Sequence, residues 1–162
     1  IAIRYPRGEA FDGLKEYRVP IAYGKSEPLF MERDILLLAV GSMVKVALTV
    51  REKLKEKGLS CSLVNARFVK PIDEELIREA CKTHRLIVTM EENVASGGYG
   101  DRVRAFVDSL GGEAKVLGIA IPDEYVEHGN VELLKQETGI DAVSVEEKVT
   151  AAWHRKTDKQ GL

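Results

Sequence analysis

The chain has 162 residues, of which 44% are hydrophobic and 31% are charged, and its formal net charge is −2. This composition is typical of one globular domain with a sizeable core, and the evenly mixed charges argue against nucleic acid or an anionic membrane as a partner. No apolar run approaches the roughly 20 residues that span a bilayer, so we expect no membrane segment.

Residues 1–10 have the pattern of the last strand of a preceding domain, since they open on apolar residues without an initiator Met. Arg7 stands between Pro6, which fixes φ, and Gly8, which tolerates any φ, so its guanidinium sits on a defined bend. A planar, always-charged fork in such a place suits a phosphate or a carboxylate. An ordinary surface arginine in a turn is the competing interpretation of these residues alone.

Residues 11–33 are expected to form a linker and an edge strand. They mix glycines, prolines and charges, and only Val19–Tyr23 alternates as a strand would; Pro20 would be tolerated at a sheet edge. Residues 34–157 alternate apolar strands with amphipathic helices. This pattern predicts a three-layer α/β/α domain with a mostly parallel sheet and one antiparallel edge strand, followed by a tail at residues 158–162.

The predicted domain begins with a central strand at Ile35–Val40, which is apolar throughout and should therefore be covered on both faces. Ser42 is expected to cap the following helix, and Gly58 to end it. The later elements are a strand at 61–66, a helix capped by Asp73, a strand at 86–90, a helix ended by Gly111, a strand at 114–120, a short helix from Asn130 to Gly139, and a last helix with Ser144 and Glu147 in capping-box spacing.

Gly97, Gly98 and Gly100 follow a predicted strand and precede a helix, which is where α/β folds bind anions on free backbone N–H groups. Their spacing matches neither GxGxxG nor a P-loop, and Glu91 and Glu92 just upstream would repel a phosphate. A structural tight turn is the favoured interpretation and a ligand cradle is the alternative. Because neighbouring strand residues point to opposite faces, the two glutamates cannot both face one substrate.

The three histidines, His84, His128 and His154, have no partner at metal-ligand spacing. His84 is expected at a helix end, where the helix dipole explains it, whereas His128 lies in a loop after a strand, where a ligand contact is an open alternative. Cys61 and Cys81 are expected to be buried in a strand and a helix, as in a reducing cytoplasm. No nucleophile, metal cluster or catalytic set is predicted, so the residues alone indicate a domain without a self-contained active site.

Six short segments carry a family resemblance: Arg4–Gly8, Leu38–Met43, Val64–Asp73, Val88–Asn93, Gly97–Gly100 and Gly118–Asp123. In this order they are similar to the C-terminal region of the 1-deoxy-D-xylulose-5-phosphate synthase family. The resemblance covers about residues 1–153, and the ordered set is specific although each segment alone is weak.

The resemblance implies a homodimeric, transketolase-type transferase that uses thiamine diphosphate and Mg²⁺. It joins two carbons of pyruvate to D-glyceraldehyde 3-phosphate with loss of CO₂, which supplies a precursor of isoprenoids, thiamine and pyridoxal. The family binds its cofactor and metal in earlier domains, so no cofactor, metal or catalytic residue is expected within this chain.

The resemblance also implies a role for part of the N-terminal segment. Residues 1–10 correspond to the end of the family's pyrimidine-binding domain. Arg7 matches the arginine that binds the phosphate of glyceraldehyde 3-phosphate, whereas Arg4 is expected to be structural and no role carries over to His128. On this reading the chain alone is inactive and serves structure and dimerisation.

Two other functions remain as alternatives: the C-terminal domain of a 2-oxoacid dehydrogenase β subunit, and a non-catalytic interaction module that mainly dimerises. The segments Asn65–Asp73 and Pro122–Asp123 fit the synthase family better than the dehydrogenase subunit.

Overall fold

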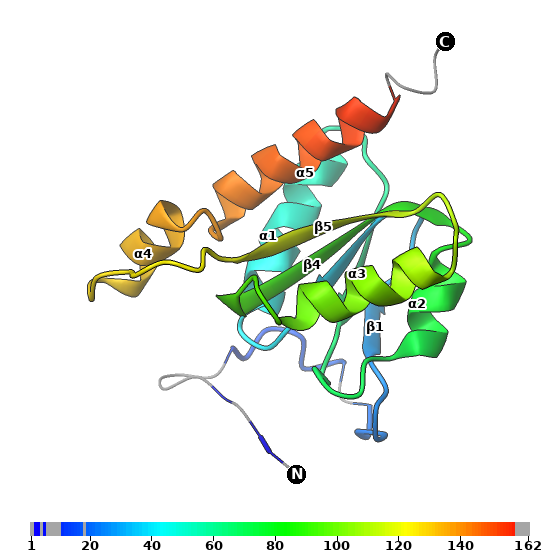
Figure 1. Cartoon of the computed structure of the whole chain (residues 1–162), viewed down its shortest axis with the longest axis horizontal. Helices are drawn as coiled ribbons and strands as arrows, with labels where there is room; N and C mark the ends of the chain where they lie inside the picture. Colours follow the sequence, from blue (N-terminus) through cyan, green and yellow to red (C-terminus); the bar gives the residue numbers. More distant parts are fainter. Residues whose placement is uncertain (1, 4, 6–10, 18, 158–162) are drawn as a thin grey trace.

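The apolar run after Arg33 forms the central strand of a five-stranded sheet in a computed structural model, which describes residues 2–3, 5, 11–17 and 19–157 (Figure 1). The strands are β1 (Glu27–Phe30), β2 (Asp34–Ala39), β3 (Cys61–Asn65), β4 (His84–Val94) and β5 (Lys115–Ile121). The helices are α1 (Met43–Glu56), α2 (Glu74–Ala80), α3 (Tyr99–Ser109), α4 (Val131–Glu137) and α5 (Ala142–Thr157).

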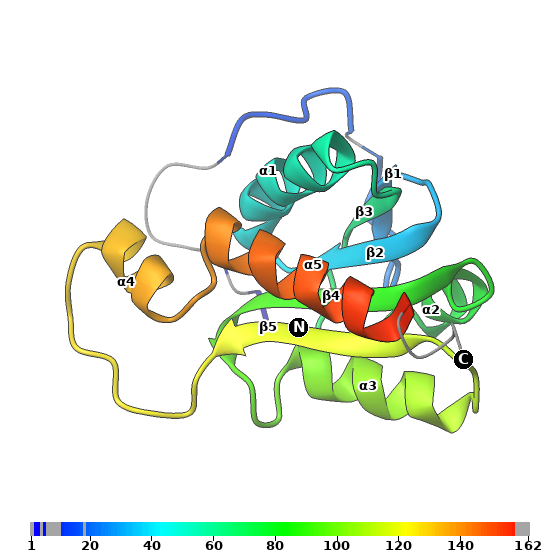
Figure 2. The ribbon, with the colours of Figure 1, turned by 90° about the horizontal axis from the view of Figure 1, so that it is seen from above.

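The strand order is β1-β3-β2-β4-β5, with β1 antiparallel to β3 and the other neighbours parallel. Helices α1 and α5 cover one face of the sheet, and α2 and α3 cover the other (Figures 1 and 2). The predicted three-layer fold with a single antiparallel edge strand is therefore confirmed for the described residues.

Strand β2 supplies both layers of the core because its side chains alternate between the two faces. Leu37 packs with α1 and α5, and Leu38 packs with α2 and α3; both side chains are fully buried. The continuous apolar run predicts this double burial, which is typical of a central parallel strand.

Several helix ends follow their local sequence signals. Asp73 caps α2 by accepting a hydrogen bond from the Leu76 N–H at 3.3 Å, and Asn130 caps α4 through the Glu132 N–H at 2.9 Å. Gly58 follows α1 with a φ of +74°, a left-handed conformation that glycine adopts without a Cβ penalty.

The edge strand lies later in the chain than the alternation at Val19–Tyr23 predicts. Those residues form no strand, and β1 instead places Glu27 opposite Asn65 in the antiparallel ladder. Pro28 is tolerated in β1 because an edge strand has one side without a partner. The Tyr23 ring contacts Phe68 and the Val19 carbonyl accepts a hydrogen bond from Arg67, and neither contact is part of a ladder.

Three other local predictions are wrong. Helix α5 begins before Ser144, because Asp141 Oδ1 accepts from the Val143 N–H at 2.9 Å. His84 is not at a helix end but is the first residue of β4, which extends beyond the predicted strand 86–90 in both directions. Cys81 is partly exposed at the C-cap of α2 rather than buried within it, whereas Cys61 is buried in β3 as expected.

Helix α4 stands apart from the sheet, at the end of the long connection from β5 (Figure 2). None of its residues is buried, and even the apolar side chains of Val131 and Leu133 are more than half exposed. In the described part of the chain, no helix is long and apolar enough to cross a membrane.

Candidate functional site

The carboxyl ends of the parallel strands meet at one edge of the sheet, which is where open α/β folds bind ligands. Ser42 follows β2 at this edge, Arg67 follows β3, and Glu91 and Glu92 lie near the end of β4. The connection from β5 to α4 completes it. Groups that could hold a substrate or cofactor are therefore expected at this edge.

Glu91 occupies the N-terminus of α3. Glu91 is only 4% exposed, and its carboxylate accepts hydrogen bonds from the N–H groups of Tyr99 at 2.9 Å and Gly100 at 2.8 Å. A Cβ at Gly98 would lie 2.6 Å from Glu91 Oε1, so the glycine allows the close approach of the carboxylate. This geometry favours the structural turn, and the N-terminus of α3 does not fit a phosphate or a diphosphate.

Glu92 serves a different set of partners, as the alternation of strand side chains predicts. Its Oε2 accepts a hydrogen bond from Ser42 Oγ at 2.6 Å, and its Oε1 lies 3.1 Å from Lys135 Nζ. Ser42 thus stands at the N-cap position of α1, but its hydroxyl donates to β4 rather than capping the helix. Glu92 joins the start of α1 to α4.

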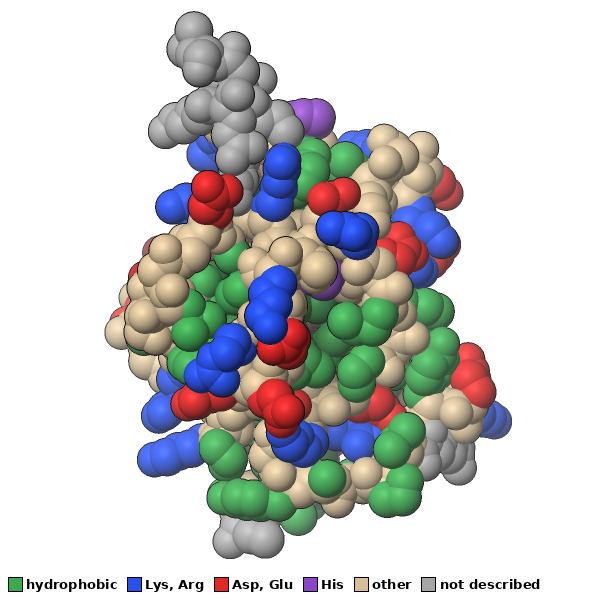
Figure 3. Space-filling view, turned by 90° about the vertical axis from the view of Figure 1, so that its right-hand side faces the viewer, with side chains coloured by type: hydrophobic (Ala, Val, Ile, Leu, Met, Phe, Trp, Pro, Cys, Tyr) green, Lys and Arg blue, Asp and Glu red, His purple; other side chains and the backbone are tan. Residues whose placement is uncertain are grey.

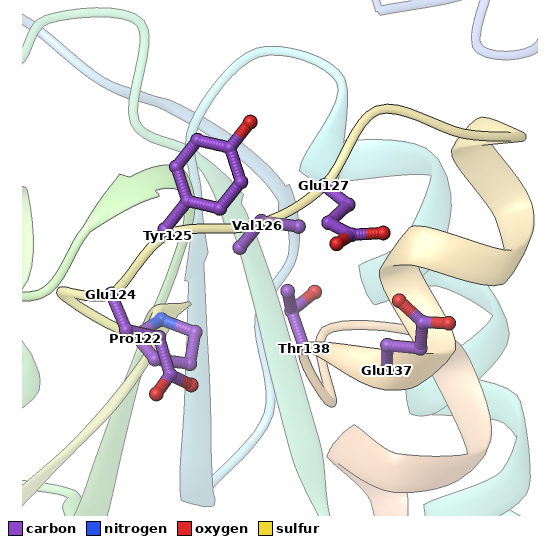
Figure 4. Close-up of a pocket in the computed structure, with 7 residues that line it drawn as sticks. All are labelled: Pro122, Glu124, Tyr125, Val126, Glu127, Glu137 and Thr138. Carbon is purple, nitrogen blue, oxygen red and sulfur yellow. The ribbon is translucent and has the colours of Figure 1, made fainter.

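Two adjoining hollows lie between the β5–α4 connection and α4, each with a volume of about 300 Å³. Figure 4 shows the more polar one, where Glu127 and Glu137 approach its α4 side and Thr138 lies near its centre. The other is lined mainly by apolar side chains, with Glu92 and Lys135 among them. Both are shallow and open, and the charged groups of the second already pair with each other.

The amino-terminal end of the sheet holds buried charges that serve structure. Arg51 Nε donates to the Cys61 carbonyl at 2.9 Å, its guanidinium lies 4.1 Å from the ring centre of Phe30, and it pairs with Glu32. Burial alone would raise the pKa of Glu32, but the Cys61 N–H and the Arg51 charge outweigh it and hold that pKa below its usual range.

The buried nucleophile candidates are also inert. Burial raises the pKa of Cys61 to about 12, so its thiol stays protonated near neutral pH. His84 Nε2 lies 2.8 Å from Ser62 Oγ, but the two residues are 2% and 0% exposed and no substrate can reach them. Among the described residues, no group of three or more His, Cys, Asp or Glu could hold a metal ion.

Not all of the residues singled out from the sequence can be placed. Arg7 and Arg4 lie outside the described residues. His128 is exposed in the connection between β5 and α4, and His154 is exposed on α5. The structure brings none of the histidines together with the glycine cluster. On the face shown in Figure 3, positive and negative side chains are interspersed, in keeping with the mixed charge pattern of the sequence.

Sequence reasoning assigned no role to Arg67, which lies in the β3–α2 connection. Its φ is +54°, and its guanidinium contacts Glu27 and the Val19 carbonyl. No local signal identifies this arrangement, because Val19 is 48 residues away in the chain.

The comparison with known proteins agrees with this fold. The transketolase C-terminal domain family model matches residues 24–145. The chain is 48% identical over 152 residues to 1-deoxy-D-xylulose-5-phosphate synthase of Lachnoclostridium phytofermentans, covering 92% of this chain and 24% of the relative. It is 38% identical over 151 residues to the synthase of Aquifex aeolicus, covering 93% of this chain and 24% of that relative.

The chain thus spans about a quarter of the length of these curated relatives. Among solved structures, a split-gene transketolase described as an inactive β4 tetramer superposes with a TM-score of 0.79 at 26% identity, over 84% of this chain and 44% of that one. The transketolase of Campylobacter jejuni shares the fold, with a TM-score of 0.56 at 16% identity, over 79% of this chain and 18% of that one. The chain belongs to the transketolase C-terminal domain family, as the sheet order, the two-sided core and the family match together show.

Proposed function

We propose that this chain forms the C-terminal part of a 1-deoxy-D-xylulose-5-phosphate synthase, a thiamine-diphosphate and Mg²⁺ enzyme of the transketolase type. The parent enzyme condenses pyruvate with D-glyceraldehyde 3-phosphate to 1-deoxy-D-xylulose 5-phosphate and CO₂. One observation carries the proposal: 48% identity to such a synthase extends over 92% of the chain.

In this proposal residues 1–10 end the pyrimidine-binding domain, residues 11–33 connect it to the sheet, residues 34–157 form the C-terminal domain, and 158–162 are a tail. Arg7 binds the phosphate of glyceraldehyde 3-phosphate, since a planar, always-charged guanidinium suits a bidentate contact with phosphate oxygens. Thiamine diphosphate, when bound, supplies the electron sink for decarboxylation. The N-terminus of α3 does not fit the diphosphate of that cofactor, because the Glu91 carboxylate already accepts from the N–H groups there.

The role of Arg7 is tested by Arg7→Ala in the intact synthase. Loss of a charge-assisted phosphate contact should raise the KM for glyceraldehyde 3-phosphate about tenfold or more. The KM for pyruvate should change little, because pyruvate carries no phosphate. Equal rises for both substrates would show that Arg7 is not a phosphate ligand.

The role of the chain as a non-catalytic part is tested separately. The isolated chain, mixed with both substrates, thiamine diphosphate and Mg²⁺, should give no product above a protein-free control. The intact synthase assayed in parallel should turn over. Product formation by the isolated chain would contradict the proposal.

A second role, in subunit association, is favoured by α4 and the connection that precedes it. Tyr125, Val131 and Leu133 expose 88%, 62% and 58% of their surface, and a similar chain is described as a tetramer. We propose that this region contributes to a homodimer contact of the parent enzyme, which we take to work in the cytoplasm. Leu133→Ser should weaken association in sedimentation velocity, whereas Val19→Ser, an equally exposed apolar residue elsewhere, should not. If the Leu133→Ser variant stayed fully dimeric, α4 would not be part of the contact.

A further inference from the structure

Five consecutive apolar residues lie on the surface just before β1. This apolar run is residues 19–23, Val-Pro-Ile-Ala-Tyr, and all five are exposed. Val19, Ile21 and Tyr23 show 61%, 73% and 75% of their surface to solvent. The run lies below β1 in Figure 1, and hydrophobic side chains gather at the lower end of the face shown in Figure 3. Single exposed apolar residues are ordinary, but an unbroken run of this length is typical of a surface that another part of a protein covers.

Contacts from the β3–α2 connection hold the apolar run in place. The Val19 carbonyl accepts a hydrogen bond from Arg67 Nη2 at 3.2 Å, and the Tyr23 ring packs edge-to-face on Phe68, with centres 5.7 Å apart. These contacts fix the two ends of the run and leave Ile21 between them exposed. A surface that is fixed before it binds loses little conformational entropy on binding. The run is therefore preformed for a partner.

The chain just before the apolar run is anchored on the same domain. Leu14 and Tyr17 pack against the core layer that contains α1, and the Tyr17 ring lies 5.7 Å from the Phe30 ring. In the proposed function residue 10 is the last of the preceding domain, so it is four residues from Leu14 and nine from Val19. Extended chain reaches about 14 Å over four residues and about 30 Å over nine. The preceding domain thus ends within reach of the run.

A partner on the same polypeptide suits the apolar run better than a free protein does. A stable contact between two free proteins takes about 20–30 residues from each side, whereas the run supplies five. A tethered domain has an effective concentration in the millimolar range, so a smaller contact is enough to keep it docked. The chain spans about a quarter of the length of its curated relatives, which leaves ample chain for such a domain in the parent.

We propose that the apolar run 19–23 is the docking surface for the domain that precedes residue 11 in the parent enzyme, and that this domain covers it with apolar side chains of its own. The inference rests on the proposed function, because that function supplies the preceding domain. Burial of the run would remove five apolar residues from water and fix the orientation of the preceding domain on the sheet.

The test measures how fast a thiol in the apolar run reacts with a maleimide. Val19→Cys is made in the 162-residue chain and in the intact synthase, and each rate is divided by the rate in the urea-unfolded protein. Mass spectrometry follows the peptide that carries residue 19. This peptide should react at nearly the unfolded rate in the 162-residue chain and at least about tenfold more slowly in the intact synthase, where only local opening would expose the thiol.

Two further variants separate docking from a general slowing. Ala105→Cys, exposed on α3, is the matched control and should react equally fast in both proteins. Ile21→Asp, added to Val19→Cys in the intact synthase, should speed the reaction at residue 19 about fivefold, because a buried carboxylate opposes an apolar contact. The same substitution should leave the urea midpoint of the 162-residue chain unchanged, since Ile21 is exposed there.

Equal rates for Val19→Cys in the 162-residue chain and the intact synthase would overturn the docking surface. Equal slowing at Ala105→Cys would also overturn it, because the protection would not be specific to the run. If Ile21→Asp split the synthase into smaller species in sedimentation velocity, the run would belong to a contact between subunits instead. Turnover of pyruvate and glyceraldehyde 3-phosphate is measured on the same synthase sample. Turnover with an unprotected residue 19 overturns the docking surface alone, whereas protection without turnover supports docking and overturns the proposed activity.

Discussion

The imidazole of His84 is enclosed at the start of β4, where it joins β3 to α2. Its Nε2 lies 2.8 Å from Ser62 Oγ, and its Nδ1 lies 3.0 Å from the Ala80 carbonyl. Since a carbonyl only accepts, Nδ1 carries the proton and Nε2 accepts from the serine. Burial lowers the pKa of His84; the Ala80 carbonyl and Asp34 oppose this shift, and the positive charge of Arg33 adds to it.

This lowered pKa predicts a loss of stability in mild acid. The unfolded chain takes up a proton at His84 below about pH 6.5, whereas the folded chain resists it until a lower pH, so the free energy of unfolding should fall as the pH drops through that window. The free energy of unfolding, measured with urea, should fall less between pH 7.5 and 5.5 in His84→Asn than in the wild type. Parallel pH curves for His84→Asn and the wild type would contradict this assignment.

At the scale of elements, α3 depends on a carboxylate from the preceding strand. Glu91 accepts two N–H groups at the helix N-terminus, where a negative charge is also favoured by the helix dipole. Glu91→Gln should therefore lower the free energy of unfolding by about 2 kcal/mol, because it removes the charge and turns an amide donor toward N–H groups. Glu92→Gln, its more exposed neighbour, should cost about 1 kcal/mol or less. Urea unfolding of both variants measures this difference. Equal losses of unfolding free energy would show that the Glu91 cap stabilises the fold no more than the contacts of Glu92 do.

The elements also show where local sequence patterns are sufficient. The apolar run of β2 and the capping residues Asp73 and Asn130 act within a few positions, so the sequence predicts them. Ser42 is also at its predicted position, but its hydroxyl donates to Glu92, a partner 50 residues away. The guanidinium of Arg67 likewise contacts distant residues, since Val19 is 48 residues away in the chain. Element types and their order were therefore predictable, whereas edges and polar partners set by tertiary contacts were not.

For the whole molecule, the two core layers are coupled through the sheet that they share. Leu37 belongs to the layer with α1 and α5, and Leu38 to the layer with α2 and α3, yet they are adjacent in β2. Loss of either layer would expose one face of the central strand to water. The two layers should therefore unfold together, as in most small single domains.

Trp153 allows this coupling to be measured, because it is the only tryptophan and packs in the layer with α5. Leu38→Ala, on the opposite face, should lower the free energy of unfolding by about 3 kcal/mol through the lost contacts and the cavity left behind. The urea midpoint from tryptophan fluorescence should shift by as much as the midpoint from far-ultraviolet circular dichroism. Leu37→Ala, in the layer of Trp153, is the matched control and should also shift both midpoints together. A fluorescence midpoint that stays at the wild-type value in Leu38→Ala would show that the layers unfold independently.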